Sequence, residues 1–348
     1  MKLLIITQKV DINDDILGFF HGWIKEFAKH CESIIVICLQ KGEYDLPENI
    51  KILSLGKEKF SHHSHRFRRL ALFFKYIWQY RKNYDSVFVH MNQEYVLLGG
   101  LFWKIFGKKV FMWRNHPHGN FLTSMAVFLS NKVFCTSKYS YTAKFKKTEI
   151  MPAGIDTNLF KRDETIPRGH HSILFLGRIA PVKRPDMLID AVALLKKKDI
   201  LAEARLYGNP APRDKEYFEF LKKKAGDLGA AESVHFHSGI PNEKTPAIYN
   251  QHAVFVNASP SGMYDKTIFE AMACESLVLT SNINLKGKID EKFLFMENDG
   301  EDFAKQLICL LALPFEEKEK LGKILRAFVV SNHSLTILGD KLAKRLAS

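Results

Sequence analysis

The chain has 348 residues, enough for two domains that each bury their own hydrophobic core. Its apolar content of 46% and charged content of 26% are typical of a soluble globular protein, whereas the formal net charge of +13 favours a polyanionic partner such as nucleic acid, an anionic bilayer or a phosphorylated substrate. No window of about 18 uninterrupted apolar residues occurs, so no membrane span is expected.

The chain begins with MKLLIITQKV, whose short apolar run predicts a buried first strand rather than a signal peptide. The cysteines show neither CxxC nor paired spacing, so we expect buried thiols in a reducing compartment, without disulfides or zinc. They are Cys31, Cys38, Cys135, Cys274 and Cys309. The expected location is therefore the cytoplasm.

The first elements predict a Rossmann-like order. Residues 3–7 form an apolar strand, a helix begins near Phe19, and residues 33–39 form the next strand. The loop between them lacks GxGxxG, so we expect Gly18 to line an inter-domain cleft on the acceptor side rather than to hold a dinucleotide. Asp11, Asp14 and Asp15 come without further ligands at metal-like spacing, which favours a solvated acidic turn and no metal site.

Residues 60–82, FSHHSHRFRRLALFFKYIWQYRK, alternate basic and aromatic side chains. Helical spacing places five apolar side chains of this segment on one face, with Trp78 near its edge. They are Leu70, Phe73, Phe74, Ile77 and Tyr80. A basic amphipathic helix with aromatics is typical of a membrane-surface element, but the same face could simply pack on the sheet. The two interpretations are compatible if the apolar face packs in the core while the flanking cations of residues 66–82 contact anionic headgroups.

Two further strands, within residues 85–92 and 108–113, end in polar side chains, the second in residues 114–118. Polar residues at strand carboxyl ends indicate a site at the edge of a parallel sheet. His116 and His118 both lie there, although a lone histidine is more often structural. We therefore treat His116 as a candidate and His118 as its competitor, because strand ends shift by a residue or two.

In the second half, residues 254–282 predict a strand, a loop with Pro260 and Gly262, a helix and another strand. A helix that follows a parallel strand offers free N–H groups to an anion, and Gly262 permits close approach of the backbone. Lys266 and Glu270 share a helical face, which suits a phosphate and sugar hydroxyls. The alternative is an ordinary crossover with a surface i,i+4 pair.

Residues 173–188, ILFLGRIAPVKRPDML, repeat this pattern: a strand reaches Gly177, and a loop carries Arg178 and Lys183 into an amphipathic helix. Gly208 also follows a strand and would allow a nucleotide to approach. Two strand–loop–helix units with basic loops predict a crevice at the carboxyl ends of parallel strands.

The combination of GRIAPVKRPDMLIDA with a later strand–loop–FEAMA segment resembles the donor-binding half of family-4 retaining glycosyltransferases, which have the GT-B fold. The resemblance implies that Arg178 and Lys183 hold the diphosphate and that Glu270 binds the ribose. His116 would contact the donor sugar near the reacting centre. The family's usual Glu, eight residues before Glu270, is Gly262 here, so the sugar contact would come from loop amides or from Asp265.

The resemblance also implies two Rossmann-like α/β domains that face a cleft. We expect an acceptor-side domain over residues 1–165, a donor-side domain over 166–330, and a C-terminal helix over 331–348 that packs back on the first domain. Proline residues and the charged run 161–164 mark the linker.

The implied activity is retaining transfer of a hexosyl group from a nucleotide-diphosphate sugar to a glycan or lipid-linked acceptor, in cell-surface polysaccharide or glycoconjugate synthesis. Neither a cofactor nor a metal is expected, and the leaving phosphate can take the acceptor's proton. The enzyme would act in the cytoplasm, peripherally at the inner membrane face. Alternatives are a catalytically impaired nucleotide-sugar binder, an inverting GT-B enzyme or epimerase, and a nucleic-acid-binding protein, the last disfavoured because no recognised module is present.

Overall fold

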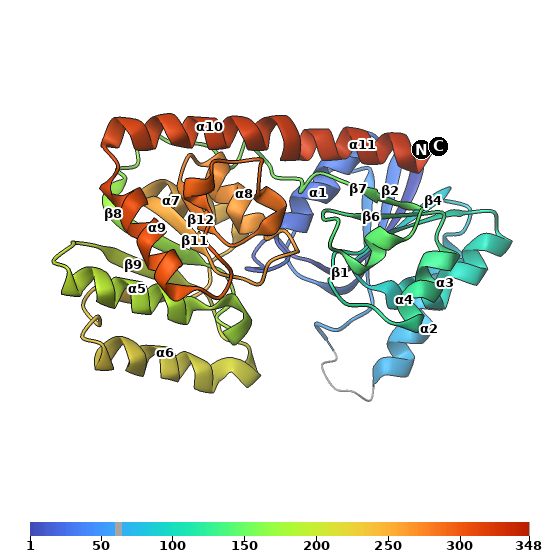
Figure 1. Cartoon of the computed structure of the whole chain (residues 1–348). Coiled ribbons are helices and arrows are strands. Elements are labelled where there is room, and N and C mark those ends of the chain that lie inside the picture. The colour runs from blue at the N-terminus through green and yellow to red at the C-terminus, as the bar shows by residue number, and fades with distance from the viewer. Residues whose placement is uncertain (60–64, 348) are drawn as a thin grey trace. The chain divides into compact units, whose positions relative to one another are not determined.

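The computed structural model describes residues 1–59 and 65–347, which form two compact units. Unit 1 comprises Met1–Gly154 and Leu335–Ser348, and unit 2 comprises Ile155–Ser334. Each unit is built on one parallel sheet with helices against it, so the predicted α/β class with two Rossmann-like units is confirmed (Figure 1). Within residues 1–59 and 65–347, no helix is long and apolar enough to cross a membrane.

The sheet of unit 1 has the order β3-β2-β1-β4-β5-β6-β7, with every neighbouring pair parallel. Its central strands are continuous apolar runs because helices cover both faces. The strands are β1 (Lys2–Val10), β2 (Ser33–Lys41), β3 (Ile50–Ser54), β4 (Ser86–His90), β5 (Lys109–Trp113), β6 (Lys132–Cys135) and β7 (Thr148–Ile150).

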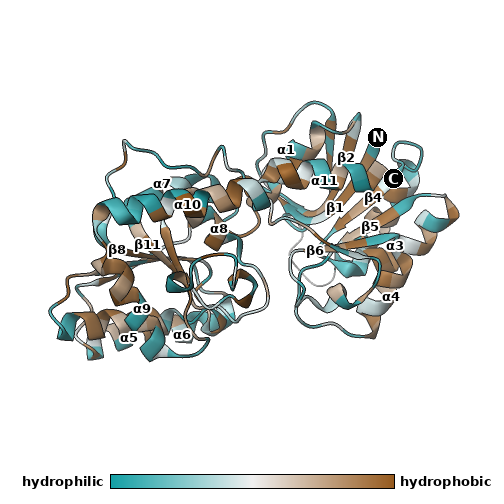
Figure 2. Ribbon diagram, turned by 45° about the horizontal axis from the view of Figure 1, so that its top comes forward, coloured by the Kyte–Doolittle hydropathy of each residue, from teal (hydrophilic) through white to brown (hydrophobic). Residues whose placement is uncertain are grey.

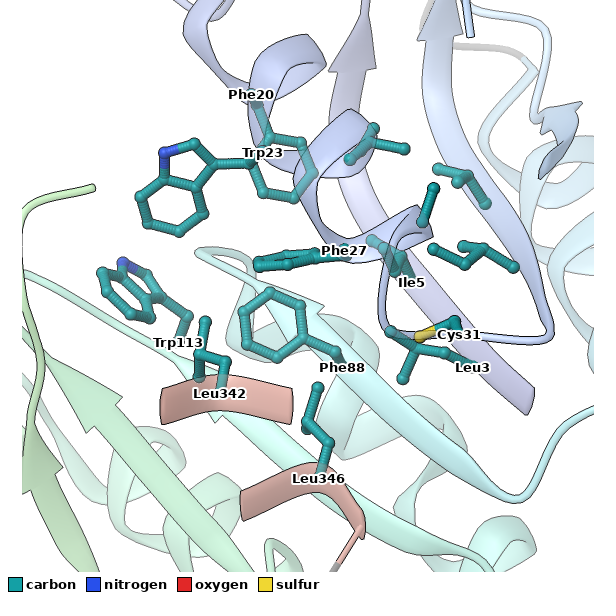
Figure 3. Packing of buried hydrophobic residues seen from close by; sticks show 14 of the residues in the cluster. Leu3, Ile5, Phe20, Trp23, Phe27, Cys31, Phe88, Trp113, Leu342 and Leu346 are labelled. Atoms are coloured by element: carbon teal, nitrogen blue, oxygen red, sulfur yellow. The ribbon is translucent and has the colours of Figure 1, made fainter. Parts of the chain in front are cut away.

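The helices of unit 1 are α1 (Phe19–Ala28), α2 (Arg66–Gln79), α3 (Gln93–Ile105), α4 (Phe121–Leu129) and α11 (Leu335–Ala347). The last helix joins this unit through its apolar stripe. Leu342 and Leu346 lie in one buried cluster with Phe88 and Trp113, as Figure 3 shows. In addition, the Ser86 hydroxyl donates to the Leu346 carbonyl (3.0 Å). Burial of this stripe is what holds the C-terminal segment against a sheet that begins at residue 2.

The sheet of unit 2 has the order β10-β9-β8-β11-β12, again parallel throughout. Its strands are β8 (Gly169–Leu176), β9 (Glu203–Tyr207), β10 (Val234–His237), β11 (His252–Asn257) and β12 (Leu277–Thr280). Its helices are α5 (Pro185–Lys197), α6 (Lys215–Asp227), α7 (Thr245–Gln251), α8 (Lys266–Ala273), α9 (Gly300–Ala312) and α10 (Phe315–His333).

The change from unit 1 to unit 2 falls at Ile155, earlier than the expected boundary near residue 165. Ile155 bridges to Ser334 in unit 2, and the carbonyls of Thr157 and Phe160 accept from Arg326 on α10. These contacts tie residues 155–165 to unit 2, although the local sequence resembles a linker. The return to unit 1 occurs at Leu335, because α10 continues to His333 within unit 2.

Several features differ from the sequence analysis. The strands β3 and β7 and the helices α3 and α4 were not predicted. No residue of β3 is fully buried, β7 has three residues, and α3 and α4 expose apolar side chains that blur their periodicity. Cys309 is exposed, whereas the other four cysteines are buried as expected. It lies outside the stripe of α9 that Phe303, Leu307 and Leu310 bury.

Candidate active site

The site predicted in unit 2 lies where the strand order of its sheet reverses. β8 comes first in sequence, and its neighbours are β9 on one side and β11 on the other. The loops that leave β8 and β11 therefore diverge at a topological switch point, where open parallel sheets bind ligands outside their carboxyl ends. One loop carries Gly177, Arg178 and Lys183, and the other carries Gly262 and Asp265.

Gly177 and Gly208 bring two strand ends into unusually close approach. Both have positive φ, 154° and 158°, and the Gly177 N–H donates to the Tyr207 carbonyl (3.0 Å). A Cβ on Gly208 would lie 1.9 Å from the Gly177 carbonyl oxygen, whereas a Cβ on Gly177 would meet nothing within 4 Å. Glycine at 208 is thus required by the neighbouring loop, while glycine at 177 leaves open space.

Lys183 and Asp265 meet across the switch point. Lys183 Nζ forms an ion pair with Asp265 Oδ2, and the Asn257 side-chain amide donates to the same oxygen (3.0 Å). Burial by itself raises the pKa of Asp265, but Lys183 and the hydrogen bonds outweigh it and hold that pKa below its usual value. Asp265 is therefore an anchored carboxylate at the N-cap of α8. It orients the cation that the sequence assigned to a diphosphate.

Glu270 is held inside the unit, one turn along α8 from Lys266. Its side chain accepts from the Tyr249 hydroxyl (3.0 Å) and the Asn242 side-chain amide (3.0 Å). Burial raises the pKa of Glu270 despite these donors, and burial lowers the pKa of Lys266 despite the nearby carboxylate. With a fully buried Glu270, the pair is not the surface i,i+4 pair of the alternative interpretation.

The loop before α8 is pinned by side chains that the sequence analysis missed. Gly262 is buried at φ 106°, and its carbonyl accepts from the Asn284 amide (2.9 Å). The neighbouring Met263 carbonyl accepts from the Asn282 amide (2.6 Å). Asparagines that follow β12 thus set the loop's course. The only sequence signal is the SNIN run itself, whose spacing says nothing about its partners.

Arg178 differs from the residues around it. It is exposed, and none of the residues described in the structure forms a hydrogen bond or ion pair with its guanidinium. An exposed arginine that follows a positive-φ glycine presents five N–H donors to an incoming anion. Arg178 and Lys183 thus lie on the same loop, one without an anionic partner and one already paired with a carboxylate.

Gly18 belongs to unit 1, where it begins α1. Its N–H donates to the Asp14 carbonyl (3.2 Å), and a Cβ would lie 2.5 Å from that oxygen. Lys9 pairs with Asp11 (2.9 Å) and Asp14 (2.5 Å), so these two carboxylates are partnered rather than simply solvated. Burial raises the pKa of Asp14, but Lys9 and two backbone N–H groups lower it overall.

His116 and His118 lie on the loop after β5, and both are exposed. The His118 backbone N–H donates to His116 Nδ1 (3.0 Å), and Arg114 donates to the His118 carbonyl (2.9 Å). Burial lowers the pKa of the Arg114 guanidinium. The loop is therefore folded on itself, with the two imidazoles at its surface. Their role toward a donor sugar stays a prediction.

No three His, Cys, Asp or Glu side chains gather as metal ligands would in residues 1–59 and 65–347. The charged groups at the switch point are cations and two anchored carboxylates. Such an arrangement can bind a diphosphate through the loop cations and the N-terminus of α8, and hydroxyl groups through a carboxylate.

Comparison with known proteins agrees with this geometry. Residues 156–328 match the family model of glycosyl transferases group 1. A D-inositol 3-phosphate glycosyltransferase of Frankia alni is 28% identical over 155 residues, covering 41% of this chain and 38% of that protein. A GDP-mannose-dependent alpha-(1-6)-phosphatidylinositol monomannoside mannosyltransferase of Mycolicibacterium smegmatis is 36% identical over 117 residues, covering 31% of this chain and 29% of its own length. The chain thus spans well under half the length of these two curated relatives.

Among solved structures, Anabaena HepE in complex with UDP and glucose superposes with a TM-score of 0.79 at 15% identity, over 100% of both chains. At this identity the likeness concerns the fold. Through residues 156–328, nearly all of unit 2, the chain belongs to the glycosyl transferases group 1 family, and its two Rossmann-like units are those of the GT-B fold.

Proposed function

We propose that this protein transfers a sugar from a nucleotide-diphosphate sugar to a glycan or lipid-linked acceptor, with retention of configuration at the sugar. The observation that carries the proposal is the contact between the β8 and β11 loops, where Lys183 pairs with Asp265 at the start of α8. A nucleoside diphosphate needs positive charge that is in place before the bond breaks. Asp265 fixes the position of the Lys183 ammonium, and Arg178 on the same loop, which has no anionic partner among the described residues, supplies the uncompensated positive charge.

Each donor-side residue has a separate task in this proposal. Arg178 and Lys183 neutralise the charge that develops on the departing diphosphate, and the positive end of the α8 helix dipole adds to them. Gly177 and Gly262 let the backbone reach the nucleotide, and Gly208 lets the end of β9 approach the Gly177 loop. Glu270 keeps unused lone pairs beside its two donors and binds ribose hydroxyls with them.

The acceptor side is proposed to lie in unit 1. Gly18 lies at the start of α1, on the loop proposed to face the acceptor, and His116 offers an exposed imidazole to the donor sugar or the acceptor. The departing phosphate takes the proton of the acceptor hydroxyl, so no separate base and no metal is assigned. The names of the two relatives include an inositol phosphate and a phosphatidylinositol mannoside, which supports a phosphorylated or lipid-linked acceptor. We place the transfer at the cytoplasmic membrane face, where a lipid-linked acceptor would be reached.

A second candidate is a nucleotide-sugar binder without turnover. It is favoured by Gly262, which stands where the family has a sugar-binding Glu and whose carbonyl is already engaged by Asn284. Asp265 is the nearest carboxylate in sequence, and it is paired with Lys183. An epimerase, an inverting enzyme or a nucleic-acid-binding protein lacks comparable support from the site.

Thermal unfolding with UDP, GDP and their sugar conjugates tests the proposal, UDP first because the HepE structure contains it. A ligand that binds the native state raises the midpoint according to its concentration over its dissociation constant. Loss of a hydrogen bond to a charged group costs about 1.5–3 kcal/mol, so Arg178→Ala and Lys183→Ala should each weaken binding roughly 10- to 100-fold. Lys198→Ala is the control, because this exposed lysine caps the far end of α5, about 20 Å from Lys183.

Equal midpoint shifts in the wild type and the three variants, or no shift with any nucleotide, would contradict the assignment of the donor site. Donor hydrolysis then separates the two candidates. Release of free sugar by the wild type, lost in Arg178→Ala, supports the transferase. Tight nucleotide binding without any hydrolysis or transfer supports the inert binder.

A further inference from the structure

Three helices of unit 1 expose apolar side chains on their outer sides. Phe67, Phe121 and Ile105 are 84%, 75% and 80% exposed, one on each of α2, α4 and α3. Each helix carries a series of exposed residues at intervals of three or four, which is the spacing of a stripe, and Phe106 and Leu122 lie next to two of these series. The exposed set, called the three-helix platform here, comprises Phe67, Leu70, Phe74, Trp78, Leu98, Leu101, Ile105, Phe106, Phe121, Leu122, Met125 and Phe128.

The platform is continuous from helix to helix. The Trp78 ring of α2 contacts the Phe106 ring at the end of α3 (5.8 Å between centroids). Lys104 Nζ of α3 lies over the Phe128 ring of α4 (4.9 Å). Figure 1 shows α2, α3 and α4 together at one side of unit 1. In Figure 2 the brown of hydrophobic residues predominates on α3 and α4.

These side chains are additional to the core, not part of it. On α2, Phe73 and Ile77 face the sheet and are 1% and 0% exposed, whereas Leu70, Phe74 and Trp78 point outward. The apolar residues that the sequence analysis placed on one face of this helix therefore divide into two sets. One set packs on the sheet of unit 1, and the other is exposed. Exposed apolar stripes on three adjacent helices are far more than the scattered apolar residues that a soluble surface ordinarily shows.

Cations surround and interleave with the platform. The segments 65–82, 93–106 and 120–132 contain a single acidic residue, Glu94, and many basic ones. The Arg81 guanidinium lies 4.2 Å from the centroid of Trp78, so a cation covers one of the exposed rings. The Lys and Arg residues of these segments are Arg66, Arg68, Arg69, Lys75, Arg81, Lys82, Lys104 and Lys132.

We infer that the three-helix platform docks on the surface of an anionic lipid bilayer, with its apolar side chains in the headgroup–acyl boundary and its cations against the headgroups. Long basic side chains beside aromatic and aliphatic ones are what an interfacial element requires. A second copy of this chain fits poorly, because a two-fold contact would bring the same cations together. The inference rests on the proposed function, since it gives residues 66–82 two partner helices at the membrane.

Vesicle sedimentation of the full chain tests the inference without any nucleotide. We expect binding to vesicles of phosphatidylcholine with about one third phosphatidylserine, weaker binding at high salt, and little binding to phosphatidylcholine alone. The decisive variant is Ile105→Glu/Phe128→Glu, on the two helices that the sequence did not single out. Each side chain loses apolar burial worth roughly tenfold in partitioning, so the pair should weaken binding about 100-fold. The control is Leu201→Glu/Phe220→Glu, at positions 78% and 51% exposed in unit 2.

The midpoint of thermal unfolding shows whether each variant folds. If the Ile105→Glu/Phe128→Glu variant does not fold, the milder Leu101→Ser/Phe121→Ser variant takes its place. Equal vesicle binding by wild type and the α3–α4 variants overturns the inference, as does no binding at low salt. If light scattering instead shows a concentration-dependent dimer that the same variants abolish, the platform is a protein interface and the bilayer is wrong. Nucleotide-induced stabilisation of the same variants distinguishes this failure from failure of the donor site, because it reports on unit 2.

Discussion

Alanine at Gly208 should disrupt unit 2 more than alanine at Gly177, although both glycines end a strand at similar φ. The difference lies in the neighbouring chain. A Cβ on Gly208 would lie 1.9 Å from the Gly177 carbonyl oxygen, and real Cβ contacts do not fall below 3.0 Å. The two loops must therefore separate by at least about 1.1 Å, whereas a Cβ on Gly177 meets nothing within 4 Å.

The expected magnitudes follow from two costs. Alanine in this backbone region costs about 1–3 kcal/mol at either position. Overpacking adds about 1–3 kcal/mol at Gly208 alone. The variants should thus differ by about 1–3 kcal/mol in the free energy of unfolding, or about 2–12 °C in midpoint for a unit of this size. A 1 Å displacement of the loop cations should also lower turnover about 100-fold.

Urea unfolding of the wild type and the two variants measures this difference, with nucleotide binding as a second readout. Gly177→Ala is the matched control, because it carries the backbone cost without the collision. Equal destabilisation by the two substitutions would refute the reasoning, since only Gly208 faces another backbone. A fully stable Gly208→Ala protein would likewise show that the strand ends are farther apart than the structure has them.

Three other changes have expected outcomes from buried polar groups. Burial lowers the pKa of His252 to about 4 from 6.5, so the neutral ring stabilises the fold above pH 6.5. The free energy of unfolding should fall by up to about 3 kcal/mol as the pH falls from 6.5 to 4. His252→Leu should remove this loss when urea unfolding is compared at about pH 7 and about pH 4.5. Trp23→Phe removes the indole N–H that donates to the Gly154 carbonyl (2.9 Å) and should lower the free energy of unfolding by about 1–3 kcal/mol, an effect absent if water replaces the donor. Tyr249→Phe takes one donor from Glu270 and should cost about 1.5–3 kcal/mol in the same assay. An unchanged midpoint would mean that this hydrogen bond does not stabilise unit 2.

Many strands and helices of unit 2 can be predicted from the sequence, because each is specified by residues that are close together in the chain. An apolar run that ends at Gly177, with Arg178 and Lys183 before an amphipathic helix, specifies a strand, a turn and a helix from neighbouring residues alone. The same holds for the segment that leads into α8. The parallel sheet and the general place of the donor site then follow from the alternation of strands and helices.

What joins these segments was not visible in the sequence. The ion pair of Lys183 with Asp265 links positions 82 apart, and Asn282 and Asn284 reach back to a loop some twenty residues earlier. No periodicity encodes such partners, because each depends on which strands become neighbours in the sheet. The sequence also could not say where the chain changes units, since the linker-like residues 155–165 are held by Arg326 on α10.

The helices of unit 1 show the same division most clearly. The sequence by itself determined that residues 66–79 form an apolar and basic helix, because spacing and composition are local properties. Only the tertiary structure decided that Phe73 and Ile77 are covered by the sheet while Phe74 and Trp78 are left outside beside α3. Burial is a property of what packs against a side chain, and that neighbour is chosen by the whole fold.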